Sequence, residues 1–130
     1  MTGYLLDTHA LVWFDGDPGR LTEETRELLE MAQEPVYVSS ISLWEMAIKV
    51  RLGKFPEAES LVELWFARCE QLRWTELAFS SLHARDAALM EWEHKDPFDR
   101  ALAAQARSEG LSFVTRDPVF ATLPGLTVLW

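Results

Sequence analysis

Short apolar runs alternate with longer amphipathic stretches along the whole chain. The runs with the length and side chains of β-strands are GYLL (3–6), VYV (36–38), WTELAF (74–79), SFVT (112–115) and LTVLW (126–130). Helical periodicity or helix-start signals fall between them, at 9–14, 22–34, 43–52, 56–72, 81–90, 97–109 and 117–123. This alternation predicts an α/β fold, a three-layer α/β/α sandwich around a mainly parallel central sheet.

Turn residues separate these elements. The DGDPG cluster at 15–19 ends the first helix, Pro35 ends the second, and Gly53 and Gly110 follow later ones. The polar segment EWEHKD (91–96) matches no element, and we expect a surface loop there, beside the functional site.

The chain has 130 residues, of which 48% are hydrophobic, and this predicts a single folded domain spanning residues 1–130. Its one cysteine, Cys69, excludes an internal disulfide and a cysteine-based zinc cluster, and we expect a buried, inert thiol. The N-terminus lacks a basic leader, and no stretch reaches the roughly 18 apolar residues that span a bilayer. We therefore expect a cytoplasmic protein with no membrane partner.

The formal net charge is −9, which argues against a surface that coats nucleic acid generally. The charge is unevenly distributed, however, because acids far outnumber bases between residues 15 and 34. The bases that follow or flank the later acids are Lys49, Arg51, Lys54, Lys95, Arg100 and Arg116. They are either ordinary solvated cations or a basic rim around an acidic centre, and both interpretations stay open.

Four acids stand at predicted strand-to-helix junctions: Asp7, Glu45, Asp99 and Asp117. In a parallel sheet these junctions converge at the edge where the carboxyl ends of the strands face a ligand crevice. Two carboxylates about 5 Å apart repel by roughly 3 kcal/mol at an effective dielectric constant of about 20. Such a cluster stays ionised when a cation neutralises it, and hard divalent ions prefer oxygen ligands. The sequence therefore predicts a metal site.

Helix capping offers another explanation for each acid taken singly. The candidate caps are Asp7, the capping-box pair Ser42 and Glu45, Asp96 and Asp99 around Pro97, and Asp117 before Pro118. Capping does not explain why all of these side chains should meet at one edge of the sheet.

Four segments, LLDTHALVW, SSISLWEMAIK, DPFDRALAAQA and FVTRD, resemble the signature segments of the PIN-domain ribonucleases, particularly the VapC-type toxins of toxin–antitoxin pairs. The resemblance covers nearly the whole chain, in the same order and spacing. It implies a three-layer α/β/α domain, a Mg²⁺ or Mn²⁺ site, cleavage of RNA, a homodimer and a cognate antitoxin protein as partner.

Carried over residue by residue, the resemblance makes Asp7, Glu45, Asp99 and Asp117 the catalytic metal ligands. Our hypothesis is that Asp7 and Asp99 are the principal ligands of one or two ions, which Glu45 and Asp117 complete directly or through water. Asp96, an extra acid in the third segment, either ligates the metal or caps the helix, and we favour the cap. The alternatives are a metal-dependent phosphatase, a DNA nuclease, and a PIN-like scaffold that binds a partner without catalysis.

For other polar residues the sequence gives weaker evidence of a role in the site. The hydroxyls of Thr8 and Thr115 lie next to the acids, where they either hold a carboxylate or cap a helix, and Arg116 either contacts a phosphate or is solvated. The three histidines, His9, His83 and His94, share no metal-ligand spacing, and we expect none of them to be catalytic.

The chain has six tryptophans, a large number for one core of this size. Some of them should lie in exposed apolar patches, which often mark protein interfaces. This agrees with the homodimer that the resemblance implies.

Overall fold

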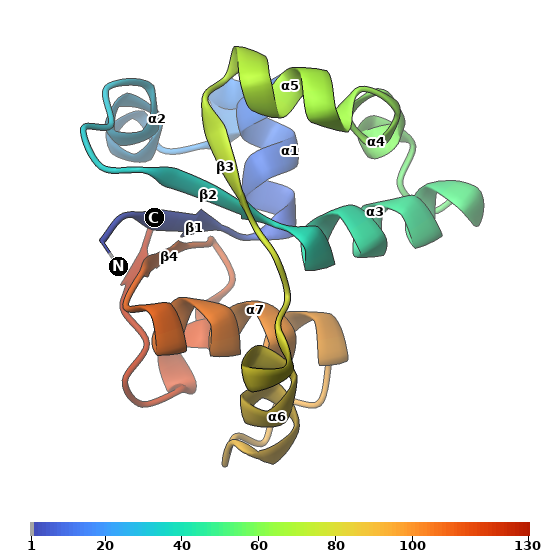
Figure 1. Ribbon diagram of the computed structural model, residues 1–130. Helices are drawn as coiled ribbons and strands as arrows, with labels where there is room; N and C mark the ends of the chain where they lie inside the picture. The colour runs from blue at the N-terminus through green and yellow to red at the C-terminus, as the bar shows by residue number, and fades with distance from the viewer. Residues whose placement is uncertain (1) are drawn as a thin grey trace.

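A five-stranded parallel sheet forms the centre of the computed structural model, which describes residues 2–130 (Figure 1). The strands are β1 (Tyr4–Leu6), β2 (Val36–Ser39), β3 (Trp74–Leu77), β4 (Ser112–Val114) and β5 (Val128–Leu129). Their order in the sheet is β3-β2-β1-β4-β5, and every neighbouring pair is parallel. The predicted parallel sheet is confirmed, with β1 at its centre.

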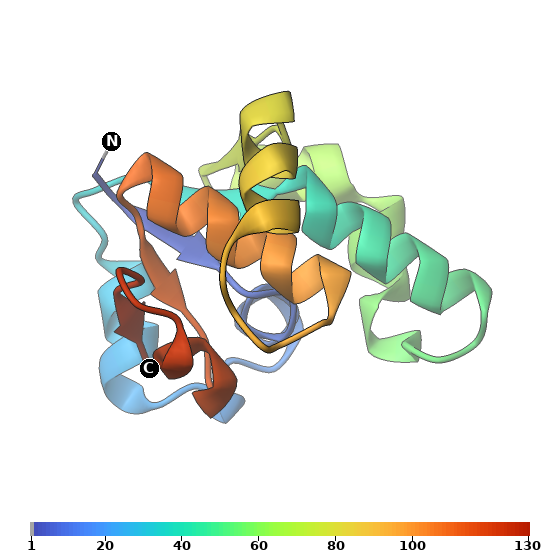
Figure 2. The ribbon, with the colours of Figure 1, turned by 90° about the horizontal axis from the view of Figure 1, so that it is seen from below.

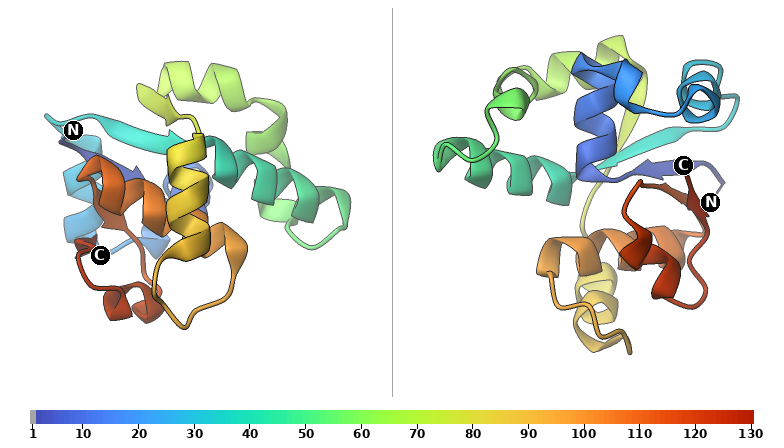
Figure 3. Two further views of the ribbon diagram at one scale, coloured as in Figure 1. Left: turned by 60° about the horizontal axis from the view of Figure 1, so that its bottom comes forward. Right: turned by 180° about the vertical axis from the view of Figure 1, so that it is seen from behind.

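Helices cover both faces of the sheet. They are α1 (Thr8–Gly16), α2 (Glu23–Glu30), α3 (Ser40–Arg51), α4 (Glu59–Glu63), α5 (Trp65–Gln71), α6 (Ser81–Leu89) and α7 (Pro97–Glu109). Three short 3₁₀ turns join them: η1 (Pro18–Arg20), η2 (Pro56–Ala58) and η3 (Pro118–Thr122). Figure 1 and the rear view in Figure 3 show α1, α2, α4 and α5 on one side of the sheet and α6 and α7 on the other. The predicted three-layer α/β/α sandwich is confirmed.

Two hydrophobic clusters hold these layers together. Successive residues of a strand point to opposite faces, so Leu6 joins the cluster with Leu11, Met46 and Trp65, while Leu5 joins the other. On that second side the buried alanines of α7, at 101, 103, 104 and 106, let the helix lie close to the sheet. Figure 2 shows α7 running across the strands with α6 beside it.

The helix predicted over 56–72 is wrong as a single element. The chain forms η2, α4 and α5 instead, with a break at Leu64, where φ is −105° and ψ is 19°. The break allows Leu61 and Trp65, each 1% exposed, to enter the same core from helices of different direction. The Trp65 indole also donates a hydrogen bond of 2.9 Å to Glu76 of β3, which fixes α5 against that strand.

The start of α3 also differs from the prediction. The helix begins at Ser40 instead of residue 43, because β2 passes directly into it and Ser39 accepts a hydrogen bond from the Ile41 amide at 3.0 Å. Ser39 is therefore the N-cap, and the capping box considered for Ser42 and Glu45 does not form. This early start places Glu45 inside the helix, with its side chain available to the site.

Two residue-level expectations need correction. Cys69 is half-buried instead of buried, and its pKa is raised, first by burial and then by the nearby Glu76 carboxylate, so its thiol is a poor nucleophile at neutral pH. The tryptophans are mostly covered: Trp65 and Trp74 are buried, Trp13, Trp92 and Trp130 are half-buried, and only Trp44 is exposed, at 59%. Within residues 2–130, none of the helices has the length and apolar character needed to cross a membrane.

Candidate active site

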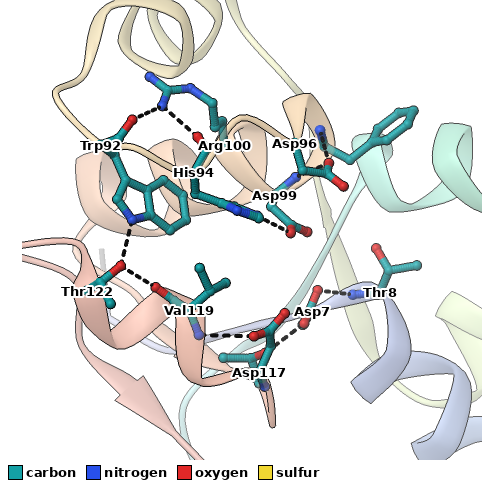
Figure 4. A network of polar contacts seen from close by, with 12 residues as sticks. Asp7, Thr8, Trp92, His94, Asp96, Asp99, Arg100, Asp117, Val119 and Thr122 are labelled. Carbon is teal, nitrogen blue, oxygen red and sulfur yellow. Dashed lines mark hydrogen bonds and ion pairs between the residues drawn. The ribbon is translucent and has the colours of Figure 1, made fainter.

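All four predicted acids line one pocket of about 460 Å³ at the carboxyl ends of β1 and β4. Asp7 follows β1, Asp117 follows β4 by a short turn, Glu45 comes from α3, and Asp99 comes from the first turn of α7. Figure 4 shows Asp7, Asp99 and Asp117 facing a common space. The parallel sheet thus brings together acids that lie as far as 110 positions apart in the sequence (117 − 7). We call this space the carboxylate pocket.

Among residues 2–130, Asp7 is the most buried carboxylate that takes part in no ion pair. It is 9% exposed, its Oδ1 accepts the Thr8 amide at 2.8 Å, and its Oδ2 accepts the Thr115 hydroxyl at 2.6 Å. Burial raises the pKa of Asp7 to about 7, and repulsion from Asp99 and Glu45 adds to this, while the hydrogen bond from Thr115 acts in the opposite direction. An Asp carboxyl in this state is ionised fully only if positive charge is supplied.

Glu45 is 5% exposed and is held by groups on two helices. Its Oε1 accepts the Thr8 hydroxyl at 2.8 Å, and its Oε2 lies 2.5 Å from the Lys49 ammonium, one turn further along α3. The Thr8 hydroxyl also lies 3.0 Å from Ser42 Oγ. Thr8 therefore links Asp7, through its amide, to Glu45, through its hydroxyl.

Asp96 and Asp99 have different positions. Asp96 caps α7, since its Oδ1 accepts the amides of Phe98 and Asp99 at 2.9 and 3.1 Å, and the capping interpretation agrees with this contact. Both acids line the carboxylate pocket, but the side chain of Asp99 caps nothing, and its Oδ2 lies 2.7 Å from Nε2 of His94. Burial raises the pKa of Asp99, the hydrogen bond to His94 lowers it, and repulsion from Asp96 and Glu45 raises it.

His94 is a residue of the site that the sequence analysis missed. Its segment, 91–96, forms the expected loop beside the pocket, but nothing in the spacing of the histidines indicated a contact with Asp99. The sequence feature that could have indicated this contact is the position of His94 in that loop, five residues before Asp99. His83, by contrast, lies in the capping box of α6 and contacts Glu109 at 2.9 Å, so it has a structural place outside the pocket.

Arg100 shapes this loop and does not belong to a basic rim. Its guanidinium donates to the backbone carbonyls of Ala87, Met90, Trp92 and His94 at distances of 2.7 to 2.9 Å. Figure 4 shows the bonds to Trp92 and His94. The Trp92 indole donates to the Thr122 hydroxyl at 2.8 Å, and that hydroxyl donates to the Val119 carbonyl, so the loop is also tied to η3.

Asp117 caps η3, and its Oδ1 accepts the Val119 amide at 3.0 Å. Its own amide donates to the Thr115 hydroxyl oxygen at 3.1 Å, while that hydroxyl donates to Asp7. Thr115, buried at 2% exposure, thereby fixes the backbone of one acid and the side chain of another. Asp7 and Asp117 each cap a helix and also line the shared pocket, so both interpretations hold for these two acids.

The basic rim is smaller than the sequence allowed. Only Lys49 and Arg116 line the carboxylate pocket, together with His9 and Trp13. Lys54 lines a neighbouring cleft, and Arg51 and Lys95 lie outside both spaces. The imidazole of His9 is exposed at its edge but packs on Phe55, and this partial burial, as the largest cause, lowers its pKa.

The donor set fits a hard divalent cation. Five carboxylates, those of the four predicted acids and of Asp96, line one pocket, and burial and repulsion between carboxylates raise the pKa of both Asp7 and Asp99, as expected where a counter-ion belongs. Over residues 2–130, no three acidic, histidine or cysteine side chains are grouped closely enough to ligate one ion directly.

Comparison with known proteins identifies the family of this fold and pocket. The PIN domain family model matches residues 4–126, and the chain therefore belongs to the PIN-domain family. It is of the VapC type, being 30% identical over 117 residues to Ribonuclease VapC22 of Mycobacterium tuberculosis, an alignment that covers 90% of this chain and 88% of that protein.

Solved structures show the same fold. A chain of the DNA-bound VapBC complex from Salmonella typhimurium matches with a TM-score of 0.72 and 24% identity, covering 99% of this chain and 98% of that one. A chain of VapBC2 from Rickettsia felis, bound to a DNA fragment from its promoter, matches with a TM-score of 0.66 and 19% identity, covering 98% and 97%. The resemblance found in the sequence is confirmed.

Proposed function

We propose that the protein is a divalent-metal-dependent endoribonuclease that acts as the toxin of a toxin–antitoxin pair. The observation that carries the proposal is the convergence of Asp7, Glu45, Asp99 and Asp117 on one pocket at the carboxyl ends of the strands. The similarity to Ribonuclease VapC22 supports RNA as the substrate. The catalytic residues we propose are these same four acids.

Asp7 and Asp99 would hold a Mg²⁺ or Mn²⁺ ion, and Glu45 and Asp117 would complete the site. Such an ion lowers the pKa of an attacking water and shields the charge that develops on the phosphate. The protein's own part is to keep the carboxylates in place. Thr115 holds Asp7 and the backbone of Asp117, Thr8 holds Asp7 and Glu45, and His94 holds Asp99.

Arg116 is the cation best placed to orient the RNA backbone. It lines the pocket and is exposed, whereas Lys49, the other cation there, is already paired with Glu45. A guanidinium donates in a planar fork that suits phosphate oxygens. We therefore assign Arg116 the contact with a phosphate beside the cleaved bond.

The partner we propose is a cognate antitoxin, as the VapBC complexes among the structural matches support. A net charge of −9 favours a basic partner and speeds its association. An arginine or lysine of that partner would enter the carboxylate pocket, pair with its acids and displace the metal. An RNA substrate places the protein's action in the cytoplasm, and we also propose that it is a homodimer.

The activity is tested by incubating the protein with RNA, single-stranded DNA and a generic phosphate ester, each with Mn²⁺ or with EDTA. We expect cleavage of RNA alone, and only with the metal. Cleavage of DNA or hydrolysis of the ester would favour the rival enzymes, and inertness toward all three would favour a binding scaffold. Expression without the partner should also slow the growth of a host, and unaffected growth would contradict the toxin assignment.

Inhibition is tested by titrating the cognate antitoxin, expected from the neighbouring reading frame, against RNA cleavage. Because the proposed partner competes with the metal through charged groups, rising Mn²⁺ and rising salt should both weaken inhibition. Inhibition that is indifferent to both would exclude insertion into the pocket.

A further inference from the structure

A second cavity adjoins the carboxylate pocket. Its volume is about 610 Å³, and it lies between α1, η1, the end of α3 and η2. We call it the aromatic cleft. Its aromatic and basic lining residues are His9, Trp13, Arg20, Lys49, Lys54 and Phe55. Three of these, His9, Trp13 and Lys49, line the carboxylate pocket as well. A ligand strand that occupies one space therefore continues directly into the other.

The rings in this cleft form a supported platform. The His9 imidazole stacks on Phe55 with ring centres 5.1 Å apart and planes inclined by 29°. Phe55 is itself 6% exposed and belongs to the core. Trp13 lies 5.7 Å from His9 and packs edge-on against Trp130 at 6.0 Å. Because these rings are already fixed by packing against other rings, stacking a ligand on them costs little side-chain conformational entropy.

Cations surround the same platform. The guanidinium carbons of Arg20 and Arg116 lie 5.7 and 5.9 Å from the centre of the Trp13 ring. Among residues 2–130, Lys54 takes part in no ion pair, and Arg20 pairs only with Asp17 at 3.1 Å, where both side chains are largely exposed. An exposed pair of this kind is weak and exchanges readily for a phosphate.

The cleft is not simply basic, since Asp17 and Glu57 line it too, and the chain as a whole carries a charge of −9. Selective recognition must then come from stacking, with the cations contributing locally. Proteins that recognise unpaired nucleotides combine these two elements, stacking bases on aromatic rings and arginine planes and pairing the backbone with cations. A base inside a duplex has no free face to offer such a platform.

We propose that the aromatic cleft binds an unpaired base of the RNA, next to the phosphodiester held at the carboxylate pocket. Trp13 and His9 stack with the base, and Arg20 and Lys54 contact the adjoining backbone. The substrate is then a single-stranded or looped segment of RNA. The inference rests on the proposed function, because it places the cleft along the strand that the acids cleave. A peptide segment of a partner is the competing occupant, and the stacked rings beside a phosphate-cleaving pocket favour RNA.

The test compares Trp13→Leu, Trp13→Phe and Lys54→Ala with Arg85→Ala, an exposed arginine on α6 that lines neither cavity. Binding of a short, fluorescently labelled, unstructured RNA is measured by anisotropy in the uncleaving Asp7→Asn protein, and the same RNA annealed to its complement is the second probe. Thermal melts check that each variant folds. Cleavage kinetics are measured with Asp7 intact.

We expect the single strand to bind more tightly than the duplex. Trp13→Leu should weaken binding between about fivefold and a hundredfold, the range for losing one stacked base, while Trp13→Phe keeps most of it. Lys54→Ala should weaken binding a few-fold. It should also reduce by about 0.7 the slope with which the logarithm of the binding constant falls against the logarithm of the salt concentration, and Arg85→Ala should change neither quantity. In cleavage, Lys54→Ala should raise KM more than it lowers kcat.

Several outcomes would overturn the proposal. They are equal binding by Trp13→Leu and Arg85→Ala, equal binding of single strand and duplex, or loss of antitoxin binding in variants that bind RNA normally. If Trp13→Leu does not fold, the test depends on Trp13→Phe and Lys54→Ala. Wild-type RNA affinity and wild-type KM in Lys54→Ala would then refute RNA binding at the aromatic cleft. Normal RNA cleavage in all variants refutes this inference alone, whereas a wild-type protein that neither binds nor cleaves RNA refutes the proposed function with it.

Discussion

The carboxyl of Asp7 is buried with hydrogen-bond donors and no cation, so its negative charge is costly while no metal is bound. We predict that Asp7→Asn abolishes RNA cleavage and leaves the thermal stability of the metal-free protein unchanged or higher. The amide keeps an oxygen for the Thr8 amide and a nitrogen that donates to Thr115. Cleavage assays and thermal melts measure the two effects. Asp86→Asn on α6, outside the pocket, is the control, and an active or unfolded Asp7→Asn protein would contradict the assignment.

The same carboxyl makes stability depend on pH. The pKa of Asp7 is raised from 3.8 to about 7 in the folded protein, so between these values the folded state holds a proton that the unfolded state has released. The stabilising contribution of Asp7 is thus complete below about pH 4 and is lost as pH rises through 7. Asp99, whose pKa is also raised, acts in the same direction.

We therefore predict that the free energy of unfolding of the wild type, minus that of Asp7→Asn, falls by a few kcal/mol between about pH 4 and pH 7 in EDTA. Taking the difference cancels the titration of the carboxyls that do not interact with Asp7. Urea denaturation across this range measures it, and Mn²⁺ should remove the fall. Parallel profiles for the two proteins would show that Asp7 has an ordinary pKa.

At the scale of elements, the loop over 91–96 depends on one side chain of α7. We predict that Arg100→Lys lowers the free energy of unfolding by about 1–3 kcal/mol, because an ammonium cannot satisfy the four carbonyls that the guanidinium bonds. Cleavage should fall as well, since His94 is displaced from Asp99. Melts, activity and the NMR shifts of the His94 ring check both effects.

Arg107→Lys provides the matched control on the same helix, as Arg107 makes only one long contact, of 3.3 Å, with the Pro124 carbonyl. If Arg100→Lys were as stable and as active as Arg107→Lys, the loop would be held by something else.

The elements and the four acids were predictable because both follow from local rules. The carboxyl ends of parallel strands converge whatever the loops do, so Asp7 and Asp117 needed only the correct strands. His94 and Arg100 were not predictable, because their partners are a side chain and carbonyls brought near by the folded loop. The break at Leu64 has the same origin, since burial of Trp65 in the tertiary core overrides the helical periodicity of 56–72.

At the scale of the whole molecule, fewer tryptophans are exposed and available for a dimer interface than the sequence predicted. Core packing covers five of the six tryptophans at least partly, but Trp44 borders an apolar groove of about 340 Å³ between α3, α6 and α7, and α6 exposes 74% of Leu89. Exposed apolar side chains beside an apolar groove often mark an interface.

We predict a dimer at micromolar concentration that Trp44→Glu dissociates, as measured by light scattering. Phe66→Glu is the control, because Phe66 is 80% exposed on α5, away from this groove. A wild-type monomer, or a dimer lost only with Phe66→Glu, would contradict the prediction.

The central place of β1 has a consequence for the protein's synthesis. β1 leaves the ribosome well before its neighbour β4 and the Thr115 hydroxyl that holds Asp7, which come 108 residues later. At about 5 to 20 residues per second, roughly 5 to 20 seconds pass between them. During that time the nascent chain has no assembled pocket, so translation itself delays the toxin's activity. A chain that terminates before β4 should for the same reason be harmless to the cell that makes it.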